Sequence, residues 1–267
     1  MSTAPMSTAE HLAAAIATLG EEGFPAALTQ WLHAELAFDN MTLLSYVEDA
    51  PPTPVYRAAR DLRVHARLDS AYLNGAYLLD PFHQLHLDGV AEGIYRLQDI
   101  APDHFTRGDY YLTYYAATTL TDEIAFLITP APGVSVMACL GRDATTNRKF
   151  SARDLAEVAR SAPICLALMR RHWAGLSGDL TGKAGESVPD RLRRNAATLG
   201  IALTPRQADV AFLILKGHST PSIALRLSVS PQTVKVFRKQ LYSRCGISSQ
   251  AELFSLFLPL LGSPEDR

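Results

Sequence analysis

Apolar and polar positions alternate with helical and strand-like periods along the first two thirds of the chain. Apolar residues at helical spacing predict helices over residues 11–19, 25–37 and 61–76. Shorter alternating or apolar runs predict strands over residues 41–47, 93–97, 123–128 and 134–140. Prolines predict the breaks between them, a turn-rich connection over 51–54 and a hairpin turn over 130–133.

A long helix is predicted to close this part of the chain. Ser151 and Asp154 have the spacing of a capping box, and Leu155 and Val158 follow on one apolar face. Pro163 is expected to kink or split the helix, because proline has no backbone N–H to donate. Helices, a central antiparallel sheet and a closing helix together predict an α+β N-terminal domain, an α/β sandwich of the PAS or GAF kind.

Residues 203–253 show a different pattern of short, capped helices. Thr204-Pro205 begins the first helix and Gly217 ends it. Ser219-Thr220 begins the second, and Ser230-Pro231 begins the third after a short turn. Two helices joined by a short turn, the second of them basic, predict an all-α helix-turn-helix domain.

The last of these helices has two opposed faces. Helical spacing places four residues on one side, namely Gln232, Lys235, Val236 and Lys239. The other side carries an apolar stripe formed by Val234, Phe237 and Leu241. The helix is therefore expected to pack by one stripe and to present a basic face to its surroundings.

Residues 201–260 resemble the LuxR-type DNA-binding domain, which is shared by quorum-sensing receptors and by response regulators similar to NarL. The resemblance rests on motif positions at the family's spacing: Leu203-Thr204-Pro205-Arg206, Gly217, Ile223-Ala224, Leu227, Ser230, Thr233-Val234-Lys235 and Gly246. The chain departs from the family at Gln207, Pro221-Ser222 and Phe237, where the family usually has an acidic residue, Lys-Glu and His. These departures affect local ion pairs rather than the fold.

The resemblance implies which side chains meet a DNA duplex. Lys235, Val236 and Lys239 would contact base edges in the major groove, beside Gln232 on the same face. Lysine pairs with guanine acceptors, and valine contacts a thymine methyl group. The side chains nearer the phosphates would be Thr233, Arg238 and Tyr242. The alternative interpretation of this face is an ordinary solvated charged surface.

Charge is divided unevenly between the two parts of the chain. From residue 201 onward 8 Lys and Arg face 4 Asp and Glu, a balance of +4, whereas residues 1–200 carry 17 against 23, a balance of −6. Because nucleic-acid affinity begins with neutralised phosphates, a local basic module on an acidic body indicates DNA binding at one end only.

The predicted organisation has three parts. A ligand-sensing and dimerisation domain covers 1–175, a linker covers 176–200, and the helix-turn-helix domain covers 201–267. The linker is indicated by the Gly-rich and small polar stretch over 175–187. The basic run over 191–194 either approaches phosphates or is a solvated face.

Composition restricts the class of protein. The chain has 267 residues, of which 48% are hydrophobic and 19% charged, as expected for a globular protein of two domains. The sequence contains neither a signal-peptide pattern nor an apolar run of about 20 residues, so a cytoplasmic protein is expected. Three widely spaced cysteines indicate neither a disulfide framework nor a zinc site, and no cofactor is expected.

The N-terminal part has a weaker resemblance to the sensor half of LuxR-type regulators. Asp80-Pro81 is similar to a pair found in acyl-homoserine-lactone receptors, and Tyr72 and Tyr77 lie upstream. Those receptors usually have tryptophans shortly before and after that pair, whereas the tryptophans here are Trp31 and Trp173. Lactone binding therefore remains an alternative to a small molecule of another class.

Tyrosines indicate where such an effector would bind, because each offers an apolar body and one polar hydroxyl. The candidate ligand-binding residues are Tyr72, Tyr77, Asp80, Phe82, Tyr111, Tyr114, Tyr115 and Phe126. The alternative is that these aromatic residues are plain core. Asp80 would either accept a hydrogen bond from an amide or amine, or cap the turn at Pro81.

Other classes of protein have less support. His83 and His86 lie three residues apart, but a clear third metal ligand is missing, so no metal site is assigned. The sequence has no nucleophile elbow and no phosphate-cradling glycine loop, which argues against an enzyme. The acidic cluster that a phosphorelay receiver needs for Mg²⁺ is absent before Asp39.

The sequence thus predicts a ligand-responsive transcriptional regulator that binds double-stranded operator DNA as a homodimer, with RNA polymerase as a further partner and no membrane. The dimer is favoured because paired half-sites multiply weak affinity, and because the last helix is apolar on more than one face, at Leu253, Phe254, Leu256, Phe257 and Leu258. The alternatives are a quorum-sensing receptor for acyl-homoserine lactones and an interaction protein that dimerises without a ligand.

Overall fold

The computed structural model describes residues 6–176 and 187–261, and these separate into two compact units. The first unit holds the described residues of 1–64, 85–100 and 119–181. The second holds those of 65–84, 101–118 and 182–267. This division differs from the predicted one, because two segments of the N-terminal half pack with the C-terminal helices.

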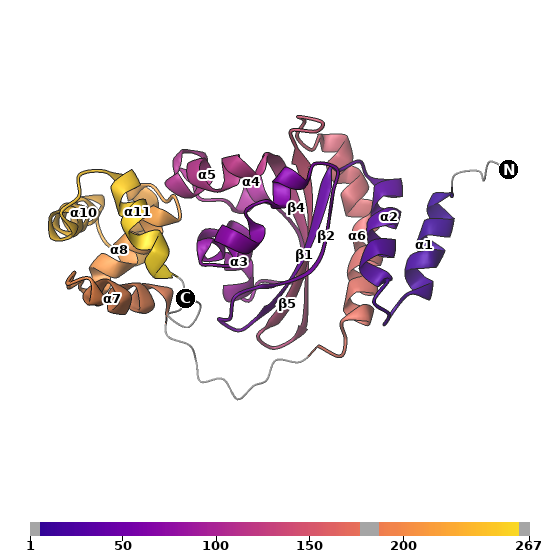
Figure 1. Ribbon diagram of the computed structural model, residues 1–267, viewed down its shortest axis with the longest axis horizontal. Helices are drawn as coiled ribbons and strands as arrows, with labels where there is room; N and C mark the ends of the chain where they lie inside the picture. Colours follow the sequence, from indigo (N-terminus) through magenta and orange to yellow (C-terminus); the bar gives the residue numbers. More distant parts are fainter. Residues whose placement is uncertain (1–5, 177–186, 262–267) are drawn as a thin grey trace. The chain divides into compact units, whose positions relative to one another are not determined.

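The first unit is built on an antiparallel sheet in the order β2-β1-β5-β4-β3 (Figure 1). Its strands are β1 (Asn40–Val47), β2 (Thr53–Ala59), β3 (Gly93–Arg96), β4 (Leu120–Ala131) and β5 (Val134–Asp143). The tight connection between β4 and β5 confirms the hairpin that the prolines at 130 and 132 indicated. A central antiparallel sheet with helices confirms the predicted class of the N-terminal domain.

Strand β2 corrects the prediction of a turn-rich connection around Pro54. The strand lies at the edge of the sheet, where a residue without an N–H is tolerated. The pairing with β1 shifts register between Leu43, which faces Tyr56, and Leu44, which faces Pro54. The irregularity accommodates the proline, so a proline-rich segment still forms a strand.

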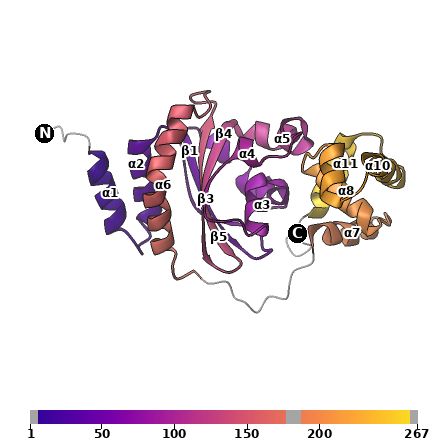
Figure 2. The same cartoon turned by 180° about the vertical axis from the view of Figure 1, so that it is seen from behind.

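Three helices of the first unit lie on one side of the sheet. Helices α2 (Phe24–Glu35) and α6 (Ala152–His172) cover one face, and α1 (Thr8–Ala17) packs against α2 (Figures 1 and 2). The capping box at Ser151 is confirmed, because its hydroxyl accepts from the Asp154 N–H and the Asp154 carboxylate accepts from the Ser151 N–H. Of the two effects expected of Pro163, a kink or a split, the split is wrong, because α6 continues as one helix past this residue.

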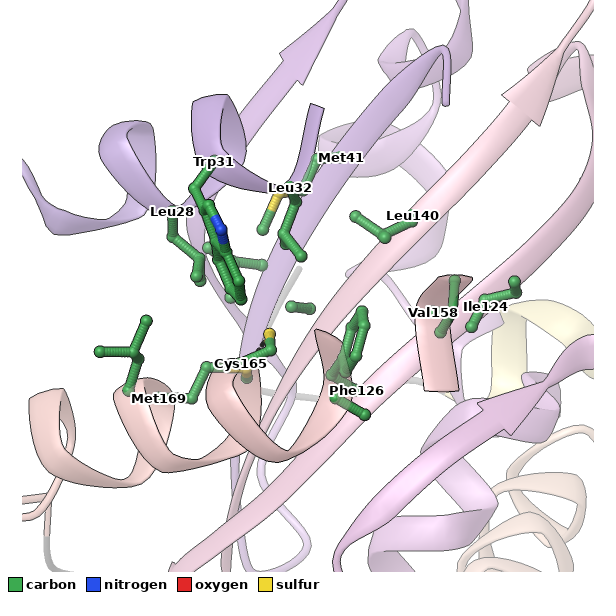
Figure 3. Packing of buried hydrophobic residues seen from close by; sticks show 14 of the residues in the cluster. Leu28, Trp31, Leu32, Met41, Ile124, Phe126, Leu140, Val158, Cys165 and Met169 are labelled. Carbon is green, nitrogen blue, oxygen red and sulfur yellow. Dashed lines mark hydrogen bonds between the residues drawn. The ribbon is translucent and has the colours of Figure 1, made fainter. Parts of the chain in front are cut away.

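Side chains from α2, α6 and the strands meet in one core (Figure 3). Trp31 of α2, Met41 of β1 and Met169 of α6 are each at most 1% exposed. Alternate residues of β4 point into this core, as the period of two in a strand requires: Ile124, Phe126 and Ile128. Each such buried side chain stabilises the fold by about 1.5–3 kcal/mol relative to exposure.

A buried carboxylate ties the sheet to the start of α6. Asp122 in β4 accepts hydrogen bonds from Arg96 Nη2 at 2.9 Å and from the Phe150 N–H at 3.0 Å. The Asp122 side chain is fully buried, and that of Arg96 is 19% exposed. Because the charge has both an opposite charge and a backbone donor, its desolvation is offset.

The N-terminal segments of the second unit are short helical turns, and the predicted continuous helix over 61–76 is wrong. The chain instead forms turns at Leu62–His65, Leu68–Tyr72 and Ala76–Leu79, with α3 (Pro81–Leu87) following. Gly75, at a φ of 122°, interrupts any longer helix because only glycine adopts this conformation readily. Further short helical pieces of this unit are Phe105–Arg107, α5 (Asp109–Thr113) and Tyr115–Thr118, whereas α4 (Leu97–Ile100) belongs to the first unit.

The C-terminal part of the second unit is all helical, as predicted. Its helices are α7 (Val188–Thr198), α8 (Pro205–Leu215), α9 (Thr220–Leu227), α10 (Pro231–Cys245) and α11 (Gln250–Leu261) (Figure 1). Helix α7 lies where the sequence predicted a linker over 176–200. Its buried residues Leu192, Asn195 and Ala196 give it a packing face, and it contacts α8 and α11. Residues 177–186 of that linker lie outside the described residues.

The apolar side chains of α11 are largely used within their own unit. Leu253, Phe254 and Phe257 are at most 4% exposed, and α11 contacts α7 and α8. Leu256 and Leu258 are half-buried. The apolar character of this helix is therefore explained by packing, and it no longer argues for a dimer surface. In the part of the chain that the structure describes, no helix is long and apolar enough to cross a membrane.

Candidate functional site

Helices α9 and α10 form the helix-turn-helix. Ser219 caps α9, with its hydroxyl accepting from the Ser222 N–H, and Ser230 caps α10 in the same way through the Thr233 N–H. Between the helices, Ser228 adopts a left-handed conformation, with a φ of 54°. Gly246, also left-handed, ends α10. Defined caps at both ends fix the length and start of the candidate recognition helix.

The two faces predicted for α10 are present in the structure. The apolar stripe is buried, with Val234 1% and Leu241 0% exposed, and Phe237 is half-buried. The opposite face is exposed over four residues, Gln232, Lys235, Val236 and Lys239. Val236 is 45% exposed, so its methyl groups are accessible on this face. This face of α10 therefore presents two lysine ammonium groups, one glutamine amide and the methyl groups of one valine.

The three residues expected nearer the phosphates lie beside this face. Thr233 is half-buried, and its hydroxyl is 2.8 Å from the hydroxyl of Ser230 at the start of α10. The Arg238 guanidinium lies over the ring of Tyr242, 5.1 Å from its centroid. This cation–π contact orients the guanidinium while leaving it charged.

A groove beside α10 contains residues that the sequence analysis did not single out. It measures about 420 Å³ and is lined by Gln207, Lys239, Gln240, Ser243 and Arg244. Two of these residues are joined directly, because the Gln207 Nε2 of α8 donates to the Gln240 Oε1 of α10 at 3.3 Å. Helical spacing from Lys239 and Val236 would have indicated Ser243 and Gln240. No pattern in the sequence indicates that Gln207 of α8 lines the same groove.

Gln207 also explains one departure from the family pattern. Its side chain accepts from the Thr204 N–H, and the Thr204 hydroxyl accepts from the Gln207 N–H, which completes a capping box. Glutamine performs this role as well as glutamate. The start of α8 is therefore kept without an acidic residue.

A second candidate site is a cluster of tyrosines around Asp80 in the second unit. The Tyr72 hydroxyl donates to Asp80 Oδ2 at 2.6 Å, and the Phe82 N–H donates to Asp80 Oδ1 at 2.9 Å. Of the two uses foreseen for Asp80, the cap of the turn at Pro81 is present, and the bond from an amide or amine of an effector stays a prediction. Burial raises the pKa of the Asp80 carboxyl, and the bonds from Tyr72 and Phe82 oppose this.

Ring contacts join the tyrosines into one cluster. The ring of Tyr72 lies 5.8 Å from that of Tyr114 and 6.3 Å from that of Tyr77. Tyr114 stacks on Tyr110 at 5.5 Å, and Tyr111 stacks on Tyr115 at 5.4 Å. Phe105 joins the two stacks, because its ring lies 5.5–6.0 Å from those of Tyr110, Tyr111 and Tyr115. Sequence reasoning missed Phe105 and Tyr110, which complete this cluster.

Two predicted companions of the tyrosines have different surroundings. Phe126 is fully buried in the core of the first unit, among residues of α2 and α6, which explains it as a packing residue (Figure 3). Phe82 is 2% exposed, and its backbone N–H serves the cap at Asp80.

The two histidines that raised the question of a metal site are used differently. The ring of Tyr77 contacts His83 edge to face at 4.9 Å. His86 has its Nδ1 2.9 Å from Ser135 Oγ and its Nε2 2.9 Å from the Glu48 carbonyl, and burial lowers the pKa of its imidazole. Among residues 6–176 and 187–261, no group of three His, Cys, Asp or Glu side chains is placed to hold a metal ion.

Comparison with known proteins places this architecture in a family. The profile described as "Bacterial regulatory proteins, luxR family" matches residues 202–257. A helix-turn-helix transcriptional regulator of Aeromonas salmonicida, described as in the exeN 3′ region, is 31% identical over 185 residues, which are 67% of this chain and 93% of that protein. The transcriptional regulatory protein NarL of Mycobacterium tuberculosis is 39% identical over 70 residues, 26% of this chain and 30% of its own.

A solved structure resembles the N-terminal part. The crystal structure of the VqsR LBD domain from Pseudomonas aeruginosa aligns with a TM-score of 0.54 and 25% identity, over 63% of this chain and 98% of that one. Fold and interface together define a helix-turn-helix regulator preceded by an α/β domain. The chain belongs to the LuxR family of bacterial regulatory proteins, and it is a transcriptional regulator rather than an enzyme.

Proposed function

We propose that this regulator binds operator DNA by placing α10 in the major groove. One observation carries the proposal: α10 exposes Lys235, Val236 and Lys239 on the side opposite its buried stripe. Lysine is suited to the guanine O6 and N7 acceptors, and valine to the thymine methyl group. Gln232 extends this base-reading face, while Thr233, Arg238 and Tyr242 contact the phosphates.

The groove beside α10 extends the proposed interface. Lys239 and Arg244 line it together with the amide groups of Gln207 and Gln240. Cations and amide donors are the groups that contact phosphate oxygens and set the register of a protein on the duplex. The DNA backbone next to the bases read by α10 is the proposed occupant of this groove.

Gel-shift titration of genomic fragments tests the proposal, with Lys235→Ala and Lys239→Ala compared with Lys149→Ala. Lys149 is an exposed lysine of the first unit, so its removal changes net charge equally. A base contact predicts a loss of about 1–3 kcal/mol on bound fragments and a smaller loss on random DNA. Equal losses on both kinds of DNA assign that lysine to phosphate, and no binding to any fragment refutes the proposal.

We further propose that a small-molecule effector binds at the tyrosine cluster around Asp80. The pairing of Tyr72 with Asp80 supports this, because it presents a buried carboxylate and a hydroxyl beside several aromatic rings. Such a combination suits a ligand with an apolar body and an amide or amine donor. Tyr77, Tyr111, Tyr114 and Tyr115 provide the aromatic surface.

An acyl-homoserine lactone is the alternative effector. The Asp80-Pro81 pair, which is similar to a pair found in acyl-homoserine-lactone receptors, favours it. Thermal denaturation with lactones of short and long acyl chains tests this directly. A rise in melting temperature with wild type, and none with Asp80→Asn, supports it. No rise with any lactone leaves the class to be found by mass spectrometry of co-purified small molecules.

The regulator is proposed to act as a homodimer on paired half-sites. A single 15-residue recognition helix binds DNA weakly. Two such helices bound to one DNA molecule multiply their affinity, which favours a dimer. Analytical ultracentrifugation with a bound fragment decides the stoichiometry. One protomer per fragment at saturation rejects the dimer while leaving the α10 interface intact.

A further inference from the structure

Two buried carboxylates meet at one end of the sheet in the first unit. Asp39 comes directly before β1 and Asp143 ends β5, and these strands pair from Asn40 opposite Gly141 onward. Asp39 is 2% exposed and Asp143 is 0% exposed. Removing a carboxylate from water is costly unless its charge is compensated, so the surroundings of this pair decide what it does.

Neutral groups donate the hydrogen bonds that these carboxylates receive. Asp39 Oδ2 accepts from the Asp143 N–H at 3.0 Å and from the Thr146 hydroxyl at 2.5 Å. Asp143 accepts from the Asn40 side-chain amide at 2.8 Å and from the Thr145 N–H at 2.7 Å. Within residues 6–176 and 187–261, neither carboxylate forms an ion pair with a lysine, arginine or histidine. Two negative charges are thus buried together, and only neutral donors compensate them.

Two buried oxygens beside this pair have no hydrogen-bond partner among the residues that the structure describes. The first is Asp39 Oδ1. Because Oδ2 of the same carboxylate is bonded to Asp143 and Thr146, this carboxylate faces the turn that follows β5. The second is the hydroxyl of Thr119, whose backbone carbonyl accepts from the Ala144 N–H of that turn at 3.0 Å. Oxygens from two other segments of the chain therefore gather at one turn.

The turn itself carries further oxygens. Residues 143–147 read Asp-Ala-Thr-Thr-Asn, which places side-chain oxygens at alternate positions, the spacing of the first ligands in a calcium-binding loop. The Asn147 N–H donates to the Asp143 carbonyl at 2.8 Å, which closes the turn. Thr145 and Asn147 are exposed. The turn therefore adds a hydroxyl and an amide oxygen next to the buried carboxylates.

We propose that this cluster is a cation site, and that Ca²⁺ is the ion it fits. Calcium takes about 6–8 oxygen ligands from carboxylates, carbonyl groups and water in flexible arrangements. Asp39 and Asp143 would supply the negative charge, and Asn147 an amide oxygen. Because the donors are all oxygens, the site differs from the His and Cys sites that zinc prefers. The ion neutralises both carboxylates and links the end of β5 to the starts of β1 and β4.

Thermal denaturation of the full-length protein tests the site. Protein freed of metal by a chelator is titrated with Ca²⁺ and, in a separate series, with Mg²⁺. Wild type is expected to gain about 5 °C in melting temperature at a hundredfold excess of Ca²⁺ over its dissociation constant. Mg²⁺ should give a smaller rise at the same concentration, because it demands a smaller and more regular ligand shell. Equilibrium dialysis should find one Ca²⁺ bound per chain.

Asp39→Asn distinguishes a cation ligand from a structural hydrogen-bond acceptor. The variant keeps the shape and one acceptor oxygen but removes a buried charge, so its response to Ca²⁺ should vanish. In the presence of chelator it should melt at or above the temperature of wild type, because one buried charge fewer opposes folding. Asp99→Asn is the matched control, since Asp99 is exposed in the same unit, and it should keep the full response to Ca²⁺.

Asn147→Gly tests the exposed part of the turn without disturbing the core. Asn147 has a φ of 50°, which glycine adopts freely, so the variant should fold like wild type. Its affinity for Ca²⁺ is expected to fall by about tenfold.

The proposed site is wrong if wild type responds to neither ion. It is equally wrong if Asp39→Asn melts below wild type in chelator and still gains the full rise with Ca²⁺, which is the behaviour of a structural acceptor. Should Asp39→Asn fail to fold, an unchanged affinity of Asn147→Gly for Ca²⁺ overturns the site. These measurements involve neither DNA nor an effector, so their failure leaves the proposed function untouched.

Discussion

The Tyr72 hydroxyl donates a 2.6 Å hydrogen bond to Asp80, whose second oxygen accepts from the backbone at Phe82. The Asp80 carboxylate thus accepts hydrogen bonds both from the start of α3 and from the tyrosine cluster. Burial raises the pKa of Asp80 and so disfavours its charged form, whereas the hydrogen bonds from Tyr72 and Phe82 favour that form. The pair is therefore sensitive to any change at either partner.

Tyr72→Phe removes a donor from Asp80 without changing the ring. We expect this variant to lose about 1–2 kcal/mol of stability, since a buried carboxylate is left with one partner fewer. It should also retain less co-purified effector, because the hydroxyl that orients Asp80 is absent. Chemical denaturation and mass spectrometry of the purified protein measure the two effects.

Tyr95→Phe is the matched control for this prediction. Its hydroxyl makes an equally short bond of 2.6 Å, to the Ala91 carbonyl, in exposed surroundings. The control should unfold like wild type and keep its effector content. If both variants retain the effector equally, the Tyr72–Asp80 pair takes no part in effector binding.

Sequence patterns predicted the C-terminal domain well because its signals are local. Caps such as Ser230, breakers such as Gly217 and the stripe of Val234 and Leu241 act within a few residues of one another. The exposed face of α10 follows from helical spacing alone. The groove beside it does not, because Gln207 reaches it from another helix.

The N-terminal half was harder to predict because its decisive contacts are distant in sequence. The aromatic ring of Phe126 indicates a pocket residue. The alternation of side chains along β4 and the packing of α6 place it in the core instead. The 61–76 segment has helical periodicity, but Gly75 and burial among aromatic rings break it into short turns. Pro54 indicated a turn, whereas an edge position makes it compatible with a strand.

Removing the buried carboxylate at Asp122 should destabilise the first unit strongly. Asp122→Ala leaves Arg96 and the Phe150 N–H without their acceptor, which costs about 3–5 kcal/mol for a broken buried pair. Asp61→Ala is the control, because its pair with Arg63 is exposed and should leave the denaturation midpoint unchanged. Equal midpoints for the two variants would contradict the structural role of Asp122.

Acid should weaken the second unit through His218. Burial lowers the pKa of this imidazole to about 4, and the charges of Arg226 and Lys216 act in the same direction. Between that value and the unfolded pKa of about 6.5, the folded state binds fewer protons than the unfolded state. The contribution of His218 is therefore complete above about pH 6.5 and is lost progressively as the pH falls towards 4.

His218→Gln isolates this dependence from that of the other histidines. The variant cannot titrate, so its free energy of unfolding should fall less than that of wild type between neutral pH and about pH 4.5. Denaturant titration at several pH values measures the difference in slope. Parallel curves for the two proteins would mean that His218 is not held in its neutral form.

Alanine substitutions at two left-handed glycines distinguish the effect of backbone strain from the effect of a close contact with Phe105. Gly217 and Gly246 have φ values of 91° and 66°, so alanine is strained at both positions, by about 1–3 kcal/mol. A Cβ at Gly246 meets open space, whereas one at Gly217 meets the backbone of Phe105 at 3.2 Å. Gly217→Ala should therefore lower the melting temperature more than Gly246→Ala, and only Gly217→Ala should speed exchange of the His104 amide, which donates to the Gly217 carbonyl at 3.0 Å. Equal effects would show that the chain at 103–105 does not press on the turn in solution.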